Sequence, residues 1–152
     1  MSDSIIEIIK NKKAKFEYEI VDTFEAGIVL RGTEVKSVRQ KKVSIQESYA
    51  KIKNNEVFIV GLNISPYEMG NVFNHDPIRE RKLLLHRHEI KRLTGKLQEK
   101  GFTLVPLKMY FKNGRAKVLL GLGKGKTLYD KRKTIQKRDV DREMKREMKK
   151  YT

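Results

Sequence analysis

The stretch TLVPLKMYFKNGRAKVLLGL, residues 103–122, decides the fold. From Thr103 to Phe111 every second residue suits a buried position, which is the period of a strand with one face in a core. Lys112-Asn113-Gly114 supplies a tight turn, and residues 116–122 return as a second strand. Pro106 has no N–H to donate, so it is expected at an edge or a bulge. The stretch therefore predicts a long β-hairpin in a mainly β domain.

Two further hairpins are predicted upstream of this stretch. In the first, alternation over residues 16–20 indicates a strand, FEAG at residues 24–27 indicates a turn, and residues 28–30 return. In the second, residues 48–53 and 56–63 flank Asn54-Asn55, a pair that tolerates the left-handed backbone of a tight turn. Residues 82–85 suggest one more short strand, and the Pro- and Asn-rich residues 66–81 suggest a loop.

Helical spacing occurs in two places. Val35 and Val38 in TEVKSVRQKK predict a short helix, and Ile90, Leu93 and Leu97 mark one face of another that is expected to end at Gly101 as its cap. The isoleucines of the first ten residues are expected to form a short helix packed on the domain or to fray.

The element count favours an OB-like β-barrel with inserted helices. It would have about six antiparallel strands and two to three short helices over residues 1–123, because closure removes exposed strand edges. Residues 124–152 form a basic C-terminal tail with sparse apolar residues. Such a segment buries too little to order itself, so we expect it to be disordered when free and helical against a partner.

The charge points to a polyanionic partner. The 152 residues carry 35 Lys and Arg against 19 Asp and Glu, a net charge of +16, which favours nucleic acid. There is no cysteine, which excludes disulfides and thiolate metal sites. The N-terminal apolar cluster is too short for a signal peptide or a membrane span, so a cytoplasmic protein without a membrane partner is expected.

The segment GLGKGKTLYDKR, residues 121–132, resembles a nucleotide-binding loop only in part. Gly125-Lys126-Thr127 supplies the ending of a Walker motif, but Leu120 stands where its first glycine is required. We interpret the segment as a junction in which Gly121 and Gly123 end the last strand and Gly125 acts as a hinge. No cofactor or small-molecule substrate is expected.

An enzyme is the main alternative, and it would use the three histidines. His86 and His88 would share one side of a strand, yet no third metal ligand is evident and cations surround them. An RNA-processing enzyme using His75, His86 and His88 therefore stays a second hypothesis. A general ribosome-associated RNA-binding OB module is a third. No catalytic or metal-binding residue is assigned.

Lysines and arginines interleaved with aromatic residues favour RNA binding, because cations neutralise phosphates and rings stack on unpaired bases. Glu25 in FEAG is an acid among bases, and it could accept hydrogen bonds from a base amino group or a ribose hydroxyl. Six ordered motifs then carry a family resemblance: NKKAKFEY, FEAGIVLRGTEVKSVR, SYAKI, RKLLLHRHEI, LVPLKMYFKNGRAKV and GKGKTLYDKR. Together they resemble the bacterial SsrA-binding proteins (small protein B, SmpB).

The resemblance implies an OB-like barrel that binds the tRNA-like domain of transfer-messenger RNA (tmRNA) and delivers it to stalled ribosomes for trans-translation. It implies that the tail enters the rRNA decoding centre and the empty mRNA channel. The implied RNA-binding residues are Asn11, Lys12, Lys13, Glu25, Lys36, Arg39, Leu84 and Lys117. The implied ribosome-binding residues are Gly125, Lys126, Tyr129, Asp130, Lys131 and Arg132. Tyr129 stands where many members have histidine; both rings can stack on an rRNA base, but tyrosine is uncharged at neutral pH.

Overall fold

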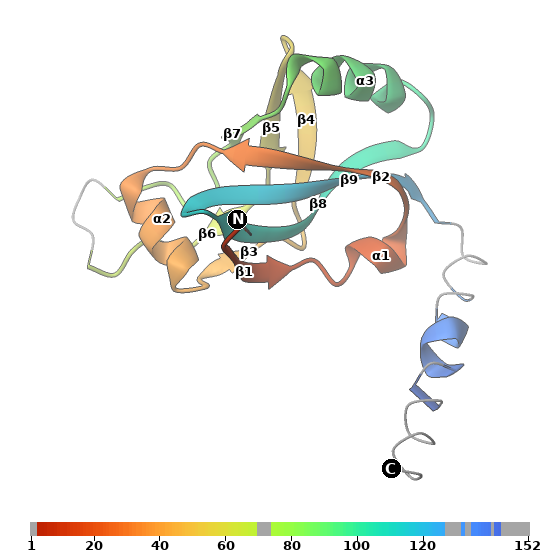
Figure 1. Cartoon of the computed structure of the whole chain (residues 1–152), viewed down its shortest axis with the longest axis horizontal. Helices are drawn as coiled ribbons and strands as arrows, with labels where there is room; N and C mark the ends of the chain where they lie inside the picture. Colours follow the sequence, from red (N-terminus) through yellow and green to blue (C-terminus); the bar gives the residue numbers. More distant parts are fainter. Residues whose placement is uncertain (1–2, 70–73, 127–131, 133–134, 141, 144–152) are drawn as a thin grey trace.

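The fold is mainly β, as the computed structural model of the chain shows (Figure 1). The structure describes residues 3–69, 74–126, 132, 135–140 and 142–143. Along this part of the chain the elements are β1 (Ile5–Lys10), α1 (Ala14–Glu17), β2 (Tyr18–Ile28), α2 (Gly32–Arg39), β3 (Val43–Ser44), β4 (Tyr49–Lys53), β5 (Glu56–Val60), β6 (Asn63–Ile64), β7 (Arg81–Leu84), α3 (Arg87–Leu97), β8 (Phe102–Lys112) and β9 (Arg115–Gly125). Among the described helices, none has the length and apolar character needed to cross a bilayer.

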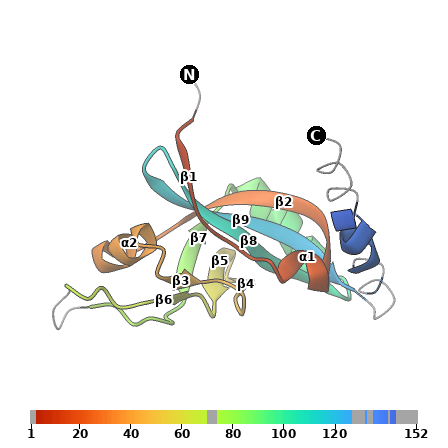
Figure 2. The ribbon, with the colours of Figure 1, turned by 90° about the horizontal axis from the view of Figure 1, so that it is seen from below.

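Six antiparallel strands close into a barrel, which confirms the predicted architecture. The strand order is β1-β8-β4-β5-β7-β2-β9, and an additional β8–β9 pairing joins the ends, so every strand of this sheet except β1 belongs to a closed ring. β1 pairs with residues 108–112, the second half of β8, whereas β4 pairs with the first half at Leu104 (Figure 2). The short strands β3 and β6 form a separate pair.

The β8–β9 hairpin contains a bulge that changes which residues face the core. Leu104 pairs with Leu122 and Met109 with Val118, while the register shifts between Pro106 and Lys108. Leu104 and Met109 are both fully buried although their numbers differ in parity. The predicted alternation from Thr103 to Phe111 is therefore wrong before the bulge, and the predicted position of Pro106 at a bulge is confirmed.

β2 is one continuous strand, so the predicted hairpin over residues 16–30 is wrong. Phe24, Ala26 and Ile28 alternate into the core, and β2 pairs with β9 from Tyr18 to Gly27. The small residues of FEAG serve packing: a Cβ on Gly27 would lie 3.3 Å from the Cβ of Leu84 on β7. Glycine is needed here for close side-chain approach across strands, which a turn signal does not distinguish.

The other predicted elements are confirmed with small changes. Asn54 and Asn55 take positive φ values of 53° and 61° in the β4–β5 turn, and α2 and α3 lie near their predicted positions. α3 ends at Leu97, so Gly101 is not its cap; with φ 88° it turns the chain into β8. The N-terminal isoleucines form neither a helix nor a frayed end, because β1 pairs with β8.

Arg81 fixes the long loop before β7 to the barrel. Its side chain is fully buried and donates to the Glu34 carboxylate and to four carbonyl oxygens, those of Leu62 (2.6 Å), Asp76, Pro77 and Arg79. Burial alone would raise the pKa of Glu34, but hydrogen bonds from Arg79, the Arg31 N–H and Arg81 outweigh it and leave this pKa below its usual value. The described part of the loop is thus held by a paired, fully hydrogen-bonded guanidinium.

Two glycines of β9 have a packing role that differs from the predicted one. β9 continues to Gly125, so Gly121 and Gly123 do not end it. A Cβ on Gly123 would lie 2.8 Å from the Cβ of Tyr18, and one on Gly121 would lie 3.0 Å from the Leu107 side chain at the bulge. These glycines let β2 and the bulge approach β9 closely.

The described part of the tail has helical backbone at residues 135–140 and 142–143, and these residues are exposed. They lie beyond the α1 end of the barrel (Figures 1 and 2). Disorder of residues 124–152 in the free protein, and their folding on a partner, stay predictions.

Candidate nucleic-acid interface

A row of cross-strand neighbours runs over the outer face of four adjacent strands. Leu84 on β7 pairs with Gly27 on β2, Gly27 pairs with Lys117 on β9, and Lys117 pairs with Tyr110 on β8. Side chains of directly paired residues stand on the same face of a sheet. Because Gly27 has no side chain, Leu84 packs against it, and Leu84 is 53% exposed there.

Glu25 lies one pleat away from this row on the same face of β2. Tyr110 Oη donates a hydrogen bond to Glu25 Oε2, and Lys112 Nζ lies 3.2 Å from Oε1. The Tyr110 hydrogen bond, with smaller effects from Lys112 and Lys117, lowers the pKa of Glu25. Glu25 is thus an ionised acceptor held in one orientation. Three residues predicted to bind RNA, Glu25, Leu84 and Lys117, therefore share one surface, which we call the Glu25 face.

A cationic groove continues from the Glu25 face toward α1. Glu25 pairs with Leu119, Leu119 with Lys108, and Lys108 with Lys10, so this second row leads directly into it. The groove has a volume of about 930 Å³ and an apolar floor that includes Leu107 and Leu119. Its described cations are Lys10, Lys12, Lys15, Lys108, Lys126, Arg138 and Arg142, against one acid, Glu19. Such a surface suits a phosphate backbone.

Sequence reasoning missed Lys10 and Lys108 as candidates. Lys10 and Lys108 are brought together only by the β1–β8 pairing, which helical or frayed N-terminal residues would not have formed. The one signal for Lys108 in the sequence is its charge within an otherwise apolar strand. In the structure its Nζ lies 5.5 Å from the centre of the Tyr110 ring.

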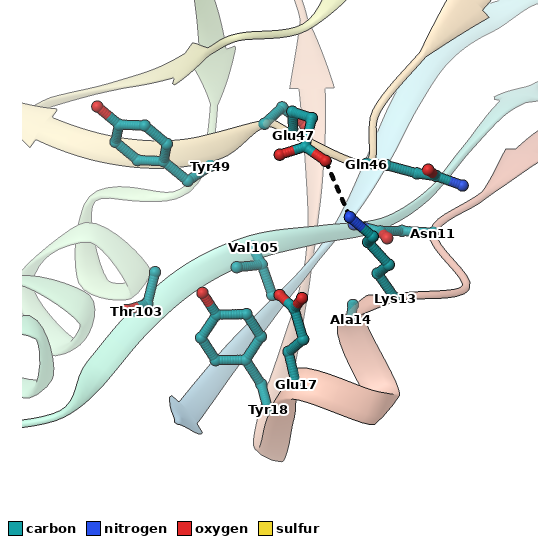
Figure 3. A pocket seen from close by; sticks show the side chains of 11 residues that line it. Asn11, Lys13, Ala14, Glu17, Tyr18, Gln46, Glu47, Tyr49, Thr103 and Val105 are labelled. Atoms are coloured by element: carbon teal, nitrogen blue, oxygen red, sulfur yellow. Dashed lines mark hydrogen bonds and ion pairs between the residues drawn. The ribbon is translucent and has the colours of Figure 1, made fainter. Parts of the chain in front are cut away.

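The three predicted residues at the N-terminal edge do not act alike. Lys12 is exposed and lines the cationic groove. Asn11 is only 7% exposed; its N–H donates to Leu107 O (2.7 Å) and its Nδ2 to Pro106 O (2.9 Å), so it clamps the β8 bulge. Lys13 pairs with Glu47 at 3.1 Å and lines a separate pocket (Figure 3).

Lys36 and Arg39 lie on α2, at the opposite end of the barrel from α1 (Figure 1). Lys36 Nζ lies 5.2 Å from the centre of the Tyr67 ring, and Arg39 Cζ lies 5.7 Å from that of Phe111. Among the described residues no hydrogen bond or ion pair joins either cation to the Glu25 face. Both therefore stay separate candidates.

The tail candidates are described only in part. Gly125 is the last residue of β9, and its N–H donates to Gly101 O at 3.2 Å. Lys126 donates from its N–H to Glu17 O and from Nζ to Lys15 O, both at 2.8 Å, so it is tied to α1. Arg132 is exposed with helical backbone. Tyr129, Asp130 and Lys131 lie outside the described residues.

The histidines do not form the predicted pair on a strand. His86 precedes α3 as its N-cap and His88 lies in its first turn, with their rings stacked at 5.5 Å. His75 is buried elsewhere: its Nε2 donates to Ile64 O and its Nδ1 accepts from Thr33 Oγ1, both at 2.8 Å. Within the described ranges, no group of three His, Cys, Asp or Glu could hold a metal ion.

Comparisons with known proteins identify the family of the chain. The family described as "SmpB protein" matches residues 8–150. The SsrA-binding protein of Acetivibrio thermocellus is 61% identical over 142 residues, covering 93% of this chain and 92% of its own length. That of Thermosynechococcus vestitus is 53% identical over 150 residues, covering 98% and 99%.

A solved structure described as "tmRNA-SmpB: a journey to the center of the bacterial ribosome" also matches. It is 52% identical, with a TM-score of 0.68, over 81% of this chain and 87% of that one. The sequence match spans both the barrel and the tail, and the fold match covers most of the chain. The chain therefore belongs to the SmpB protein family.

Proposed function

We propose that this protein binds the tRNA-like domain of tmRNA and delivers it to stalled ribosomes for trans-translation. The family membership supports this, as do the relatives named SsrA-binding protein and the solved structure whose description joins tmRNA, SmpB and the ribosome. A ribosome-bound role places the protein in the cytoplasm. The chain needs to perform no covalent chemistry in this role, because peptide transfer belongs to the ribosome.

The observation that carries the proposal is the Glu25 face with its adjoining cationic groove. Cations along the groove hold phosphates of a folded RNA, while Glu25 accepts a hydrogen bond from a base amino group or a ribose hydroxyl, which a lysine cannot do. Leu84 adds an exposed apolar contact beside Lys117. The phosphate contacts thus position the RNA, and the hydrogen bond to Glu25 makes binding selective for one RNA.

The tail supplies the second part of the proposed function. In this proposal Gly125 and Lys126 lead from the barrel to Tyr129, Asp130, Lys131 and Arg132, which bind the rRNA of the decoding centre, while the remaining tail becomes helical in the empty mRNA channel. The net positive charge supports contact with rRNA.

A competition gel at fixed salt tests the proposal, with labelled tmRNA against unlabelled bulk tRNA. We expect selective binding of tmRNA that Glu25→Ala weakens about tenfold or more, since a charge-assisted hydrogen bond contributes on the order of 1.5–3 kcal/mol. Glu56→Ala is the matched control, because Glu56 is also a strand carboxylate paired with a lysine, Lys82, at 3.3 Å. It should leave selectivity unchanged.

A chain ending at Leu128 separates binding from delivery. We expect it to keep most of its affinity for tmRNA and to lose peptide tagging in a reconstituted translation reaction. Equal affinity for tmRNA and tRNA would favour a general RNA-binding module and contradict the proposal. Tagging by the truncated chain would contradict the role of the tail.

A further inference from the structure

A second pocket adjoins the cationic groove, and the proposed function gives it no role. It has a volume of about 240 Å³ and lies between α1, residues 46–49 and the first half of β8 (Figure 3). Asn11 and Tyr18 line both this pocket and the groove, so the two cavities share a wall. The volume is below the roughly 300–1,000 Å³ of pockets for drug-sized ligands. It therefore suits a single group smaller than a drug-sized ligand.

The charges of the two cavities are opposite in kind. The groove carries seven described cations and one acid, whereas the pocket carries two acids, Glu17 and Glu47, and one cation, Lys13. Lys13 is already paired with Glu47 at 3.1 Å. The carboxylate of Glu17 has no hydrogen bond or ion pair within the described residues. A phosphate would be repelled from the pocket and attracted to the groove.

The other pocket-lining groups favour a flat ligand with donor groups. Glu17 and Tyr18 point side by side from the α1–β2 junction toward the pocket, with Val105 behind them (Figure 3). The Oδ1 atom of Asn11 is buried in the shared wall, where no described residue donates to it. A buried acceptor without a donor is uncommon in folded proteins. The pocket thus offers two aromatic rings, those of Tyr18 and Tyr49, and unfilled acceptors.

We propose that this pocket takes one unpaired guanine base of an RNA whose phosphates lie in the cationic groove. The proposal rests on the RNA binding proposed above. The two oxygens of the Glu17 carboxylate accept hydrogen bonds from the adjacent N1–H and N2–H2 groups of guanine, and the ring of Tyr18 packs against the base.

Guanine is favoured because its Watson–Crick edge presents two neighbouring donors. Adenine and cytosine each present one amino group next to an acceptor, and uracil presents one N–H between two acceptors. A carboxylate therefore forms a two-bond pair with guanine alone among the four bases. Removing the guanine amino group, as in inosine, leaves one of the two bonds.

The test uses the full chain and pentanucleotide RNAs in which four uridines flank a central guanosine, inosine, adenosine or cytidine. Fluorescence anisotropy at fixed salt gives the four Kd values. We expect the guanosine RNA to bind about tenfold more tightly than the others, the discrimination typical of a bidentate base contact. Glu17→Gln should bring the four Kd values together while circular dichroism shows an unchanged fold.

Glu99→Gln is the matched control, because Glu99 is exposed and lines neither cavity, and the substitution removes the same charge as Glu17→Gln. It should keep the preference for guanosine. Equal binding of the four RNAs by the unchanged protein, or a guanosine preference that survives Glu17→Gln, would overturn the pocket assignment. Selective binding of tmRNA that depends on Glu25 would then still stand, so failure of the pocket and failure of the proposed function give different results.

Discussion

Glu25 owes its proposed role to its immediate neighbours. In a chain with net charge +16, a lone carboxylate would exchange between several lysines. Here Tyr110 holds one oxygen and Lys112 the other, while Lys112 also lies 3.6 Å from Asp3. Each carboxylate oxygen has further acceptor capacity. The acid is therefore ready to accept a donor from RNA without first rearranging.

Tyr110→Phe tests this arrangement. Loss of the hydrogen bond should raise the pKa of Glu25 toward its usual value of 4.5, as read by NMR titration of the side-chain carboxylate. The pKa of Glu25 is lower in the folded state than in the unfolded chain. The ionised Glu25 therefore stabilises the fold above about pH 4.5, and this stabilisation is lost as the pH falls through the folded-state pKa. Urea unfolding should show the variant about 1 kcal/mol less stable at neutral pH, with a smaller difference in acid.

Tyr67→Phe controls for loss of a phenol group, because the Tyr67 ring contacts Lys36 and has no described bond to Glu25. It should leave the Glu25 titration unchanged. An unaltered Glu25 pKa in Tyr110→Phe would contradict the orienting role of Tyr110.

Among the elements, β9 shows that glycines near a basic segment do not by themselves indicate a flexible junction. Glycine suits both a hinge and a position where two backbones or side chains approach closely, and the sequence alone does not separate these uses. The structure separates them by contact: Gly121 and Gly123 face Leu107 and Tyr18, whereas a Cβ on Gly125 would meet no atom within 4 Å.

Gly123→Ala and Gly125→Ala form a matched pair on β9. The new methyl group at position 123 would overlap Tyr18, so the strands must shift, and we expect a loss of about 1–3 kcal/mol in the free energy of unfolding. The same change at position 125 should cost less than about 0.5 kcal/mol. Thermal and urea unfolding of both variants measure the difference. Similar losses in both variants would contradict close packing as the reason for Gly123.

The same elements show how far the sequence predicts this fold. Strong periodicity predicted α2, α3, the β4–β5 hairpin and the β8–β9 hairpin, because each depends on local spacing and turn residues. The β8 bulge, the uninterrupted β2 and the pairing of β1 depend on contacts between distant segments. Asn11 donates a hydrogen bond to Pro106 O, Gly27 packs against Leu84, and Ile9 pairs with Met109. Local patterns contain no such information.

For the candidate site the division is similar. The family resemblance supplied Glu25, Leu84 and Lys117, and the barrel brings them to one face. It did not indicate that Asn11 is a buried clamp, that Lys13 belongs to another pocket or that Lys10 and Lys108 extend the surface. The register of the β1–β8 and β8–β9 pairings sets the direction of each side chain, and this direction decides which residues face the core, the pocket or the groove.

At the scale of the whole molecule, the positive charge is organised rather than spread evenly. The pairings β2–β9, β8–β9 and β1–β8 give these four strands a common outer surface, and the cationic groove lies on it between the Glu25 face and α1. The described helical residues of the tail contribute Arg138 and Arg142 to the same groove. The protein thus presents the cationic groove next to the oriented carboxylate of Glu25.

A double substitution tests whether the cationic groove, and not net charge alone, holds the RNA. Lys10→Ala with Lys108→Ala removes two cations that face each other across β1 and β8. Each phosphate contact contributes about 0.7–0.9 to the slope of log K against log salt, so the slope for binding the tRNA-like domain should fall by roughly 1.4–1.8. Filter binding over a series of salt concentrations measures it.

Lys53→Ala with Lys100→Ala is the control for net charge, because both lysines are exposed and line neither the groove nor the pocket of Figure 3. It removes the same charge and should change the slope by less than about 0.5 if long-range attraction is largely screened at physiological salt. If both double variants lowered the slope equally, the total charge of the molecule would govern binding and the groove would have no special part in it. A loss confined to Lys10 and Lys108 would instead show that the β1–β8 pairing sets where the RNA backbone lies, since only this pairing brings these two residues together.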